Sequence, residues 1–204
     1  MDKLNINLIK EEDLNSVVML LTKLQDHSPE SYIHSVDVAN KSVVLALALS
    51  INPEDIKKLY TASLLHDIGK LYVTKDLLHK QNATQDEQNT IRFSHIIGTK
   101  AILSQHFDPE FVKLASHHHE RLNRTGYPEH LGGRKLDILD RILQVADVTS
   151  ALSMKRSYKE PFTNEKVCEI LDHLVQRGEL DKNCVEKAKD LLLYPTKVPT
   201  QMGL

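Results

Sequence analysis

The chain has 204 residues, of which 41% are hydrophobic and 26% are charged, and its formal net charge is −2. This composition predicts one domain with an ordinary core and excludes disordered and fibrous proteins. The small net charge gives no support for binding a nucleic-acid polymer or an anionic membrane. The longest apolar stretch, 43–51, is far shorter than the roughly 20 residues of a membrane span, and no signal peptide opens the chain. We therefore expect a cytoplasmic protein.

Helical periodicity dominates the sequence from end to end. The predicted helices span about 11–25, 29–49, 53–68, 84–106, 109–117, 137–153, 163–178 and 181–193. Several of them begin at clear capping residues, such as the capping box Thr84-Gln-Asp-Glu87 and the pair Asp108-Pro109. Residues 121–135 are rich in glycine and are predicted to form a loop. The pattern predicts an all-α fold of seven or more helices.

Two polar residues fall on helix faces that are otherwise apolar. His95 lies on the inward face of the helix that starts at Thr84, and Asp147 lies on an apolar stripe of the helix over 137–153. A buried carboxylate needs a cation or a metal ion as a partner. Each residue taken alone is explained by an ordinary core histidine and an ordinary buried salt bridge.

Further histidines and carboxylates occupy other predicted helices. Glu30 and His34 lie one turn apart on one helix face. The pairs His66-Asp67 and His118-His119 each stand at the end of a helix. Imidazoles and carboxylates from several helices can converge in a bundle, and they suit iron, manganese or zinc better than copper. The combination therefore predicts a site with more than one metal ion.

Three motifs extend this pattern, namely His66-Asp67-Ile68-Gly69-Lys70, His118-His119-Glu120 and Gly126-Tyr127-Pro128. Together they resemble the HD-GYP family of cyclic-dinucleotide phosphodiesterases, a subgroup of the HD metal-dependent phosphohydrolases. The resemblance covers about residues 30–159 and implies an HD-domain helical bundle with a GYP loop. We expect a helical extension over 1–28, an HD-GYP catalytic domain over 29–194 and a tail over 195–204.

The resemblance also implies a set of metal ligands. These are His34, His66, Asp67, His95, His118, His119 and Asp147, with Glu30 as the ligand of a third ion. We expect two or three divalent ions, iron first and manganese as the alternative. The register of the three consecutive histidines is ambiguous, but the spacing to Gly126 favours 118 and 119 and leaves His117 as a neighbour.

The implied catalytic residues are Asp67, placed to bridge two metals, and Lys70, placed near the scissile phosphate. The implied substrate-binding residues are Lys70, Gly126, Tyr127, Pro128, Arg156 and Lys159, the last two holding the phosphates. Two metals that share a carboxylate can activate a water for in-line attack on a phosphodiester. Residues 121–159 carry eight basic and four acidic side chains, which fits either a solvated face or an anion-binding wall.

The sequence departs from the family pattern in the substrate region. Asn123-Arg124 stands where the family commonly has Asp-Gly or Asn-Gly, and Ser150 stands where it commonly has aspartate. Arg124 therefore either joins the basic wall or closes the loop against guanine. These departures leave the metal ligands untouched and put the choice of substrate in question.

These motifs and the expected ligand set are compatible with three functions. The leading hypothesis is hydrolysis of a cyclic dinucleotide, cyclic di-GMP or cyclic GMP-AMP, to a linear dinucleotide or mononucleotides. The alternatives are another HD-type nucleotide phosphohydrolase and a non-catalytic cyclic-dinucleotide-binding or scaffold protein. The expected ligand set favours an enzyme, and protein partners or a homodimer are possible sources of regulation.

Overall fold

Helices make up all the regular structure of the residues that the computed structural model describes, 4–155 and 160–193. The α-helices are α1 (Leu14–His27), α2 (Pro29–Ala48), α3 (Pro53–Leu65), α4 (Lys75–Leu78), α5 (Gln85–Leu103), α6 (Pro109–Ser116), α7 (Ile138–Ser153), α8 (Asn164–Gln176) and α9 (Lys182–Leu193). Two short 3-10 helices, η1 (Ile6–Leu8) and η2 (Ile68–Tyr72), complete the set. The predicted all-α fold class is confirmed.

Capping residues explain why most helices begin where they do. The capping box of Thr84 and Glu87 opens α5, and Asp108 accepts hydrogen bonds from two backbone N–H groups at the start of α6. Asn52 and Thr163 cap α3 and α8 in the same way. These side chains satisfy backbone donors that a helix start leaves without partners. The short helices η1, η2 and α4, of three to five residues, have no counterpart among the predicted helices.

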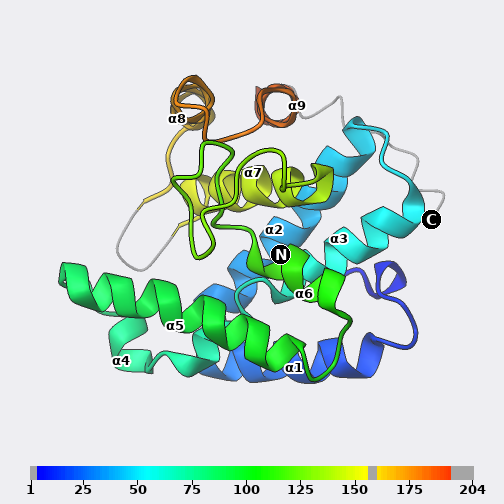
Figure 1. Ribbon diagram of the computed structural model, residues 1–204, viewed down its shortest axis with the longest axis vertical. Helices are drawn as coiled ribbons and strands as arrows, with labels where there is room; N and C mark the ends of the chain where they lie inside the picture. Colours follow the sequence, from blue (N-terminus) through cyan, green and yellow to red (C-terminus); the bar gives the residue numbers. More distant parts are fainter. Residues whose placement is uncertain (1–3, 156–159, 194–204) are drawn as a thin grey trace.

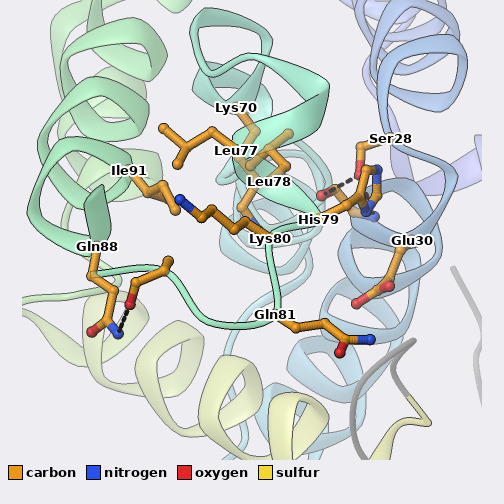
Figure 2. Close-up of a pocket in the computed structure, with 12 residues that line it drawn as sticks. Ser28, Glu30, Lys70, Leu77, Leu78, His79, Lys80, Gln81, Gln88 and Ile91 are labelled. Atoms are coloured by element: carbon orange, nitrogen blue, oxygen red, sulfur yellow. Dashed lines mark hydrogen bonds between the residues drawn. The ribbon is translucent and has the colours of Figure 1, made fainter. Parts of the chain in front are cut away.

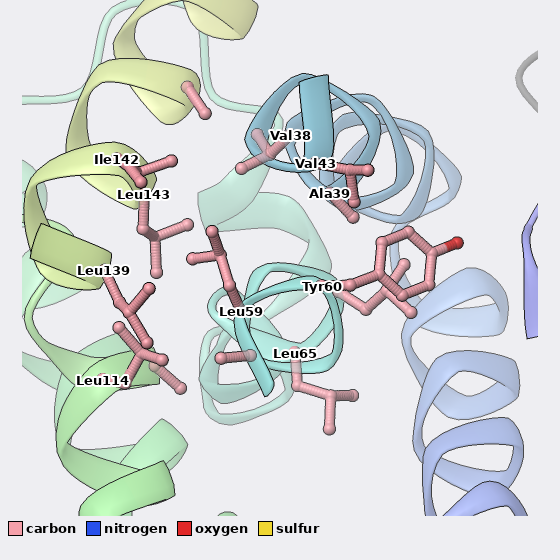
Figure 3. Close-up of a cluster of buried hydrophobic side chains, with 14 of the residues drawn as sticks. Val38, Ala39, Val43, Leu59, Tyr60, Leu65, Leu114, Leu139, Ile142 and Leu143 are labelled. Atoms are coloured by element: carbon pink, nitrogen blue, oxygen red, sulfur yellow. The ribbon is translucent and has the colours of Figure 1, made fainter. Parts of the chain in front are cut away.

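The hydrophobic core lies where α2, α3 and α7 pack against one another (Figure 1). Leu59 and Tyr60 of α3 are fully buried; Leu59 lies between Ala39 of α2 and Leu143 of α7, and Tyr60 lies on the side of α3 away from α7 (Figure 3). The pair α8 and α9 covers one side of α7, whereas α1, α4 and α5 lie at the opposite end of the molecule (Figure 1). Burial of each large side chain stabilises the fold by about 1.5–3 kcal/mol.

Helix α1 contributes to the same core. Its residues Val17, Leu20, Leu21 and Leu24 are buried, and the helix packs against α2. The predicted boundary between a helical extension (1–28) and a catalytic domain (29–194) stays a prediction. Buried residues from both segments belong to one hydrophobic core. The tail over 195–204 lies outside the described residues. None of the helices in the described ranges combines the length and apolar character needed to cross a membrane.

A contact between two glycines joins η2 to α5. A Cβ atom on Gly69 would lie 1.8 Å from the carbonyl oxygen of His95, and one on Gly98 would lie 2.8 Å from the carbonyl oxygen of Gly69. The Gly69 amide donates to the hydroxyl of Thr99, and this hydroxyl donates to the carbonyl of His66. Only glycine permits this approach, which fixes His95 beside the end of α3.

Candidate metal and substrate site

Five segments bring the candidate metal ligands together at the centre of the molecule. His34 comes from α2, His66 and Asp67 from the junction of α3 and η2, and His95 from α5. His118 and His119 follow α6, and Asp147 comes from α7. All are buried except His119, which is half-buried. The inward orientation predicted for His95 and Asp147 is what the structure has.

The first group of potential ligands consists of His34, His66 and Asp67. One ligand atom from each lies within 4.8 Å of the other two. Asp147 adjoins this group, because its Oδ1 lies 3.0 Å from His34 Nε2 and 3.9 Å from His66 Nε2. Two imidazoles and two carboxylates therefore face one small volume.

The second group consists of His95, His118 and His119, whose ligand atoms also lie within 4.8 Å of one another. Asp67 lies between the two groups. Its Oδ1 is 3.2 Å from His95 Nε2, whereas its Oδ2 is 3.6 Å from His66 Nε2. A carboxylate with one oxygen toward each group has the geometry needed to bridge two metal ions.

Hydrogen bonds on the far side of the rings orient three of these histidines. His66 Nδ1 lies 2.7 Å from the Ser63 carbonyl and His118 Nδ1 lies 2.9 Å from the Ala115 carbonyl, so each Nδ1–H donates to a backbone oxygen. His34 Nδ1 lies 3.0 Å from the hydroxyl of Ser150. For His66 and His118 such outer bonds fix the tautomer and present Nε2 to a metal, whereas His34 Nε2 donates to Asp147 in this structure. The departure at Ser150 therefore keeps a polar partner for His34.

The donor set fits a metal ion. His66 Nε2 is buried and has no hydrogen-bond partner among the described residues. A buried imidazole nitrogen without a partner is costly unless something coordinates it. Imidazoles with carboxylates are ligands that iron, manganese and zinc accept. The two groups are thus suited to hold divalent ions, with Asp67 shared between them.

Electrostatics favour the protonation states that metal ligands need. Burial opposes ionisation of Asp67, yet the neighbouring Lys70 and His66 hold its pKa well below the usual range. Burial also opposes ionisation of Asp147, and the hydrogen bond from His34 holds that pKa well below its usual value. Burial lowers the pKa of His118. The carboxylates are therefore ionised and the His118 imidazole is neutral at pH 7.

Lys70 links this centre to a pocket of about 320 Å³ (Figure 2). Its Nζ lies 2.5 Å from Asp67 Oδ2, and its side chain also lines the pocket. Glu30 is on the α2 side of the same pocket and lies outside both ligand groups (Figure 2). Leu77 and Ile91 provide apolar surface there. A cation beside an open pocket is suited to receive an anionic ligand.

The loop that contains Gly126, Tyr127 and Pro128 borders the centre on another side. A Cβ atom on Gly126 would lie 2.4 Å from the Arg121 backbone nitrogen, so glycine is required here. Tyr127 stacks on His119, with ring centroids 4.7 Å apart and an angle of 27° between the planes. The Tyr127–Pro128 peptide bond is cis. The loop thus places one aromatic ring directly against a potential metal ligand.

Glu120 anchors this loop. Its side chain is fully buried, and its two carboxylate oxygens accept hydrogen bonds from the backbone N–H groups of Glu129 and Leu131. In the sequence, Glu120 served only to mark the register of the histidines. Its position next to a glycine-rich loop is the sequence feature that indicates this role, because a carboxylate can accept hydrogen bonds from loop N–H groups.

The remaining candidates are placed differently. His117 lies 3.1 Å from Asp140 Oδ1, outside both ligand groups, as expected for a neighbour of the centre. Arg124 is exposed and lines another pocket than Lys70 does. Arg156 and Lys159 lie outside the described residues.

Comparisons with known proteins agree with this architecture. Residues 18–184 match the profile of the family described as "HD domain". The 3'3'-cGAMP-specific phosphodiesterase 1 of Vibrio cholerae is 34% identical over 172 residues, which are 83% of this chain and 40% of that protein. The cyclic di-GMP phosphodiesterase PA4108 of Pseudomonas aeruginosa is 31% identical over 147 residues, 71% of this chain and 36% of that protein.

Solved structures show the same fold. A "HDG"Y"P" protein of Bdellovibrio bacteriovorus, Bd1817, superposes with a TM-score of 0.64 at 21% identity, covering 89% of this chain and 62% of that one. The HD domain of the L. monocytogenes phosphodiesterase PgpH in complex with cyclic-di-AMP gives a TM-score of 0.64 at 21% identity. The superposition covers 87% of this chain and 95% of that one. The predicted resemblance is confirmed, although the chain spans only about 40% or less of the length of the two relatives above.

Proposed function

Because this chain belongs to the HD domain family, we propose that it is a metal-dependent phosphodiesterase that hydrolyses a cyclic dinucleotide. The observation that carries the proposal is the position of Asp67 between the two groups of histidines. The relatives support the substrate class, since they are named as phosphodiesterases of cGAMP and cyclic di-GMP. Cyclic di-GMP is the first candidate and cyclic GMP-AMP the second.

In the proposed mechanism, the two ligand groups would hold two divalent ions, and Asp67 would serve both groups. When bound, such ions supply an activated water and Lewis-acid stabilisation of the scissile phosphate. Lys70 stabilises negative charge that develops on the phosphoryl oxygens, because its ammonium group lies beside Asp67 and lines the open pocket. Tyr127, held against His119, forms the wall of the site on the loop side.

Other parts of the proposal rest on the family pattern alone. Glu30 would hold a third ion, and Arg156 and Lys159 would hold the phosphate that is not cleaved. Gly126 and Pro128 would shape the loop around the substrate. Iron is the first choice of metal and manganese the second. A cytoplasmic location and regulation by a protein partner or a homodimer also stay predictions.

Metal and product analysis test the proposed function together. We expect protein purified without added metal to contain at least two equivalents of a divalent metal, or to bind them on titration with Fe²⁺ or Mn²⁺. We expect the loaded protein to convert cyclic di-GMP or cyclic GMP-AMP to the linear dinucleotide or mononucleotides. Binding of these compounds without cleavage under either metal would contradict the enzyme and favour a binding protein. Cleavage of mononucleotides alone would favour another HD phosphohydrolase.

A further inference from the structure

A row of aromatic rings leads from the candidate metal centre to the surface of α5. Tyr127 stacks on His119, and the ring of Phe93 follows with its centroid 6.3 Å from that of Tyr127. Phe93 is 50% exposed, so one part of its ring faces solvent. A single exposed phenylalanine is ordinary, but here its ring is tilted by 56° against Tyr127, which itself stacks on a potential metal ligand.

Arg92 adds a cation to the same place. Its guanidinium carbon lies 6.0 Å from the centroid of the Tyr127 ring. Arg92 is exposed and precedes His95 by three residues, so both side chains leave α5 on neighbouring parts of its surface. No carboxylate within residues 4–155 and 160–193 forms an ion pair with Arg92, whereas Lys70 and Lys100 each have one. A cation without such a partner is available to an anionic ligand.

We propose that Arg92, Phe93 and Tyr127 form a substrate-binding wall that holds one nucleobase and one phosphate of the cyclic dinucleotide. A base can stack on the exposed ring of Phe93 and meet the tilted ring of Tyr127 with its edge, as bases do on aromatic side chains of nucleic-acid-binding proteins. The planar guanidinium of Arg92 can donate two hydrogen bonds to a phosphate oxygen pair. The proposal deepens the proposed function and rests on it for the identity of the ligand.

The Tyr127 ring also supports the position of Arg92, because a guanidinium beside an aromatic ring makes a cation–π contact. Ile91, which precedes Arg92 in α5, lines the pocket that contains Lys70 (Figure 2). We expect one substrate with two phosphates to contact both Lys70 and Arg92.

The test uses the full chain loaded with Mn²⁺ and two substrates. Cyclic di-GMP has two bases and two phosphates, whereas methyl p-nitrophenyl phosphate has one phosphate and no base. We expect Phe93→Ala and Arg92→Ala each to raise the KM for cyclic di-GMP about tenfold, within the range measured for loss of one base stack. The kcat, and the kinetics with the small diester, should stay within about twofold of wild type.

Matched variants separate the wall from general effects on α5. Ile97→Ala removes a side chain that is 64% exposed one turn along the same helix, and Arg177→Ala removes an exposed arginine at the end of α8. Both controls should leave the KM unchanged. Phe93→Tyr should restore binding, whereas Phe93→Leu, which keeps an apolar side chain without the ring, should not. Circular dichroism checks that each variant is folded.

Calorimetric titration of cyclic di-GMP into the metal-free protein separates failure of the wall from failure of the proposed function. If wild type binds in this titration but the metal-loaded protein does not cleave, the phosphodiesterase proposal fails, and the Kd of the variants still decides on the wall. Kd and KM values of Phe93→Ala and Arg92→Ala that equal wild type would overturn the wall. Absence of binding and cleavage with every cyclic dinucleotide tried would overturn both.

Discussion

The His/Asp centre and the hydrophobic core are buried to the same degree but differ in how their atoms are satisfied. Leu59 and His66 are both fully buried. Leu59 meets apolar neighbours from α7 that need nothing further (Figure 3). His66 Nε2, in contrast, has no hydrogen-bond partner among the described residues. The apolar core is therefore complete without a ligand, whereas a metal ion would satisfy His66 Nε2 in the centre.

This difference separates stability from activity in the molecule. The core gains free energy from apolar burial, which depends only on the chain. The centre gathers histidines and carboxylates whose desolvation costs free energy until metal ions coordinate them. Substitutions in the core should therefore act on unfolding, and substitutions in the centre should act on metal binding and turnover.

The largest expected effect is loss of turnover in Asp67→Ala. The change removes the carboxylate that faces both histidine groups, while α3 and η2 keep their backbone bonds. We expect activity to fall more than about 100-fold, the loss caused by removing even the outer partners of metal ligands. Metal content and steady-state kinetics measure it, and circular dichroism should show unchanged helix content. Asp76→Ala, on the exposed surface of α4, is the control. An active Asp67→Ala enzyme would refute the bridging role.

The converse effect is expected for Leu59→Ala in the core. Removing a fully buried leucine should lower the free energy of unfolding by about 2–5 kcal/mol through lost burial and a cavity. Denaturant titration measures the change. Below its unfolding transition the variant should bind metal and turn over substrate as wild type does. Leu193→Ala, at a residue that is 41% exposed, should cost less than about 1 kcal/mol. A loss of metal affinity in folded Leu59→Ala would show that the core and the metal centre do not act independently on stability and activity.

The sequence predicted the fold through its capping residues and its helical period. Thr84, Asp108 and Asn52 stand at helix starts because their side chains satisfy free backbone N–H groups locally. The short helices η1 and α4 escaped prediction, since one turn carries no period. Their existence depends on contacts made by the folded chain.

The potential metal ligands could be predicted from the sequence, whereas the contacts that hold and surround them could not. Histidines and carboxylates on apolar helix faces are visible in the sequence, and the structure places them together. The contact of Gly69 with Gly98 depends on two segments about 30 residues apart, and no local pattern reveals it. Arg92 and Phe93 look like ordinary surface residues until Tyr127 is placed beside them.

A smaller effect is expected when the metal-free protein is acidified. Burial lowers the pKa values of His95 and His118 below the usual 6.5, so the unfolded chain takes up protons before the folded chain does. The stability that their neutral forms contribute is complete above pH 6.5 and falls as the pH drops below it. The melting temperature should therefore decrease from pH 7.5 to pH 5.5.

Two comparisons sharpen this experiment. His173→Gln, at an exposed histidine of α8, should leave the pH dependence unchanged. Saturating Mn²⁺ should raise the melting temperature at pH 7.5, because ligands that bind only the folded state stabilise it. A melting temperature that rises on acidification would contradict the lowered pKa values of His95 and His118.

The smallest effect is expected for Arg124→Gly, outside both regions. Arg124 has a φ of 67°, in the left-handed region that glycine adopts without strain. A Cβ atom on Gly132 would lie 2.9 Å from Arg124 Nε, so this side chain lies along the loop, in a pocket with Arg134 and Lys135. That pocket does not include Lys70.

Glycine at this position relieves backbone strain but increases the freedom of the unfolded chain, and these two effects oppose each other. We expect the free energy of unfolding to change by less than about 1 kcal/mol. The KM for cyclic di-GMP should stay within about twofold of wild type, because Arg124 and Lys70 line separate pockets. Parallel kinetics with cyclic di-GMP and cyclic GMP-AMP measure the preference. Improved cleavage of cyclic di-GMP alone would instead show that Arg124 obstructs guanine, the other expectation drawn from the sequence.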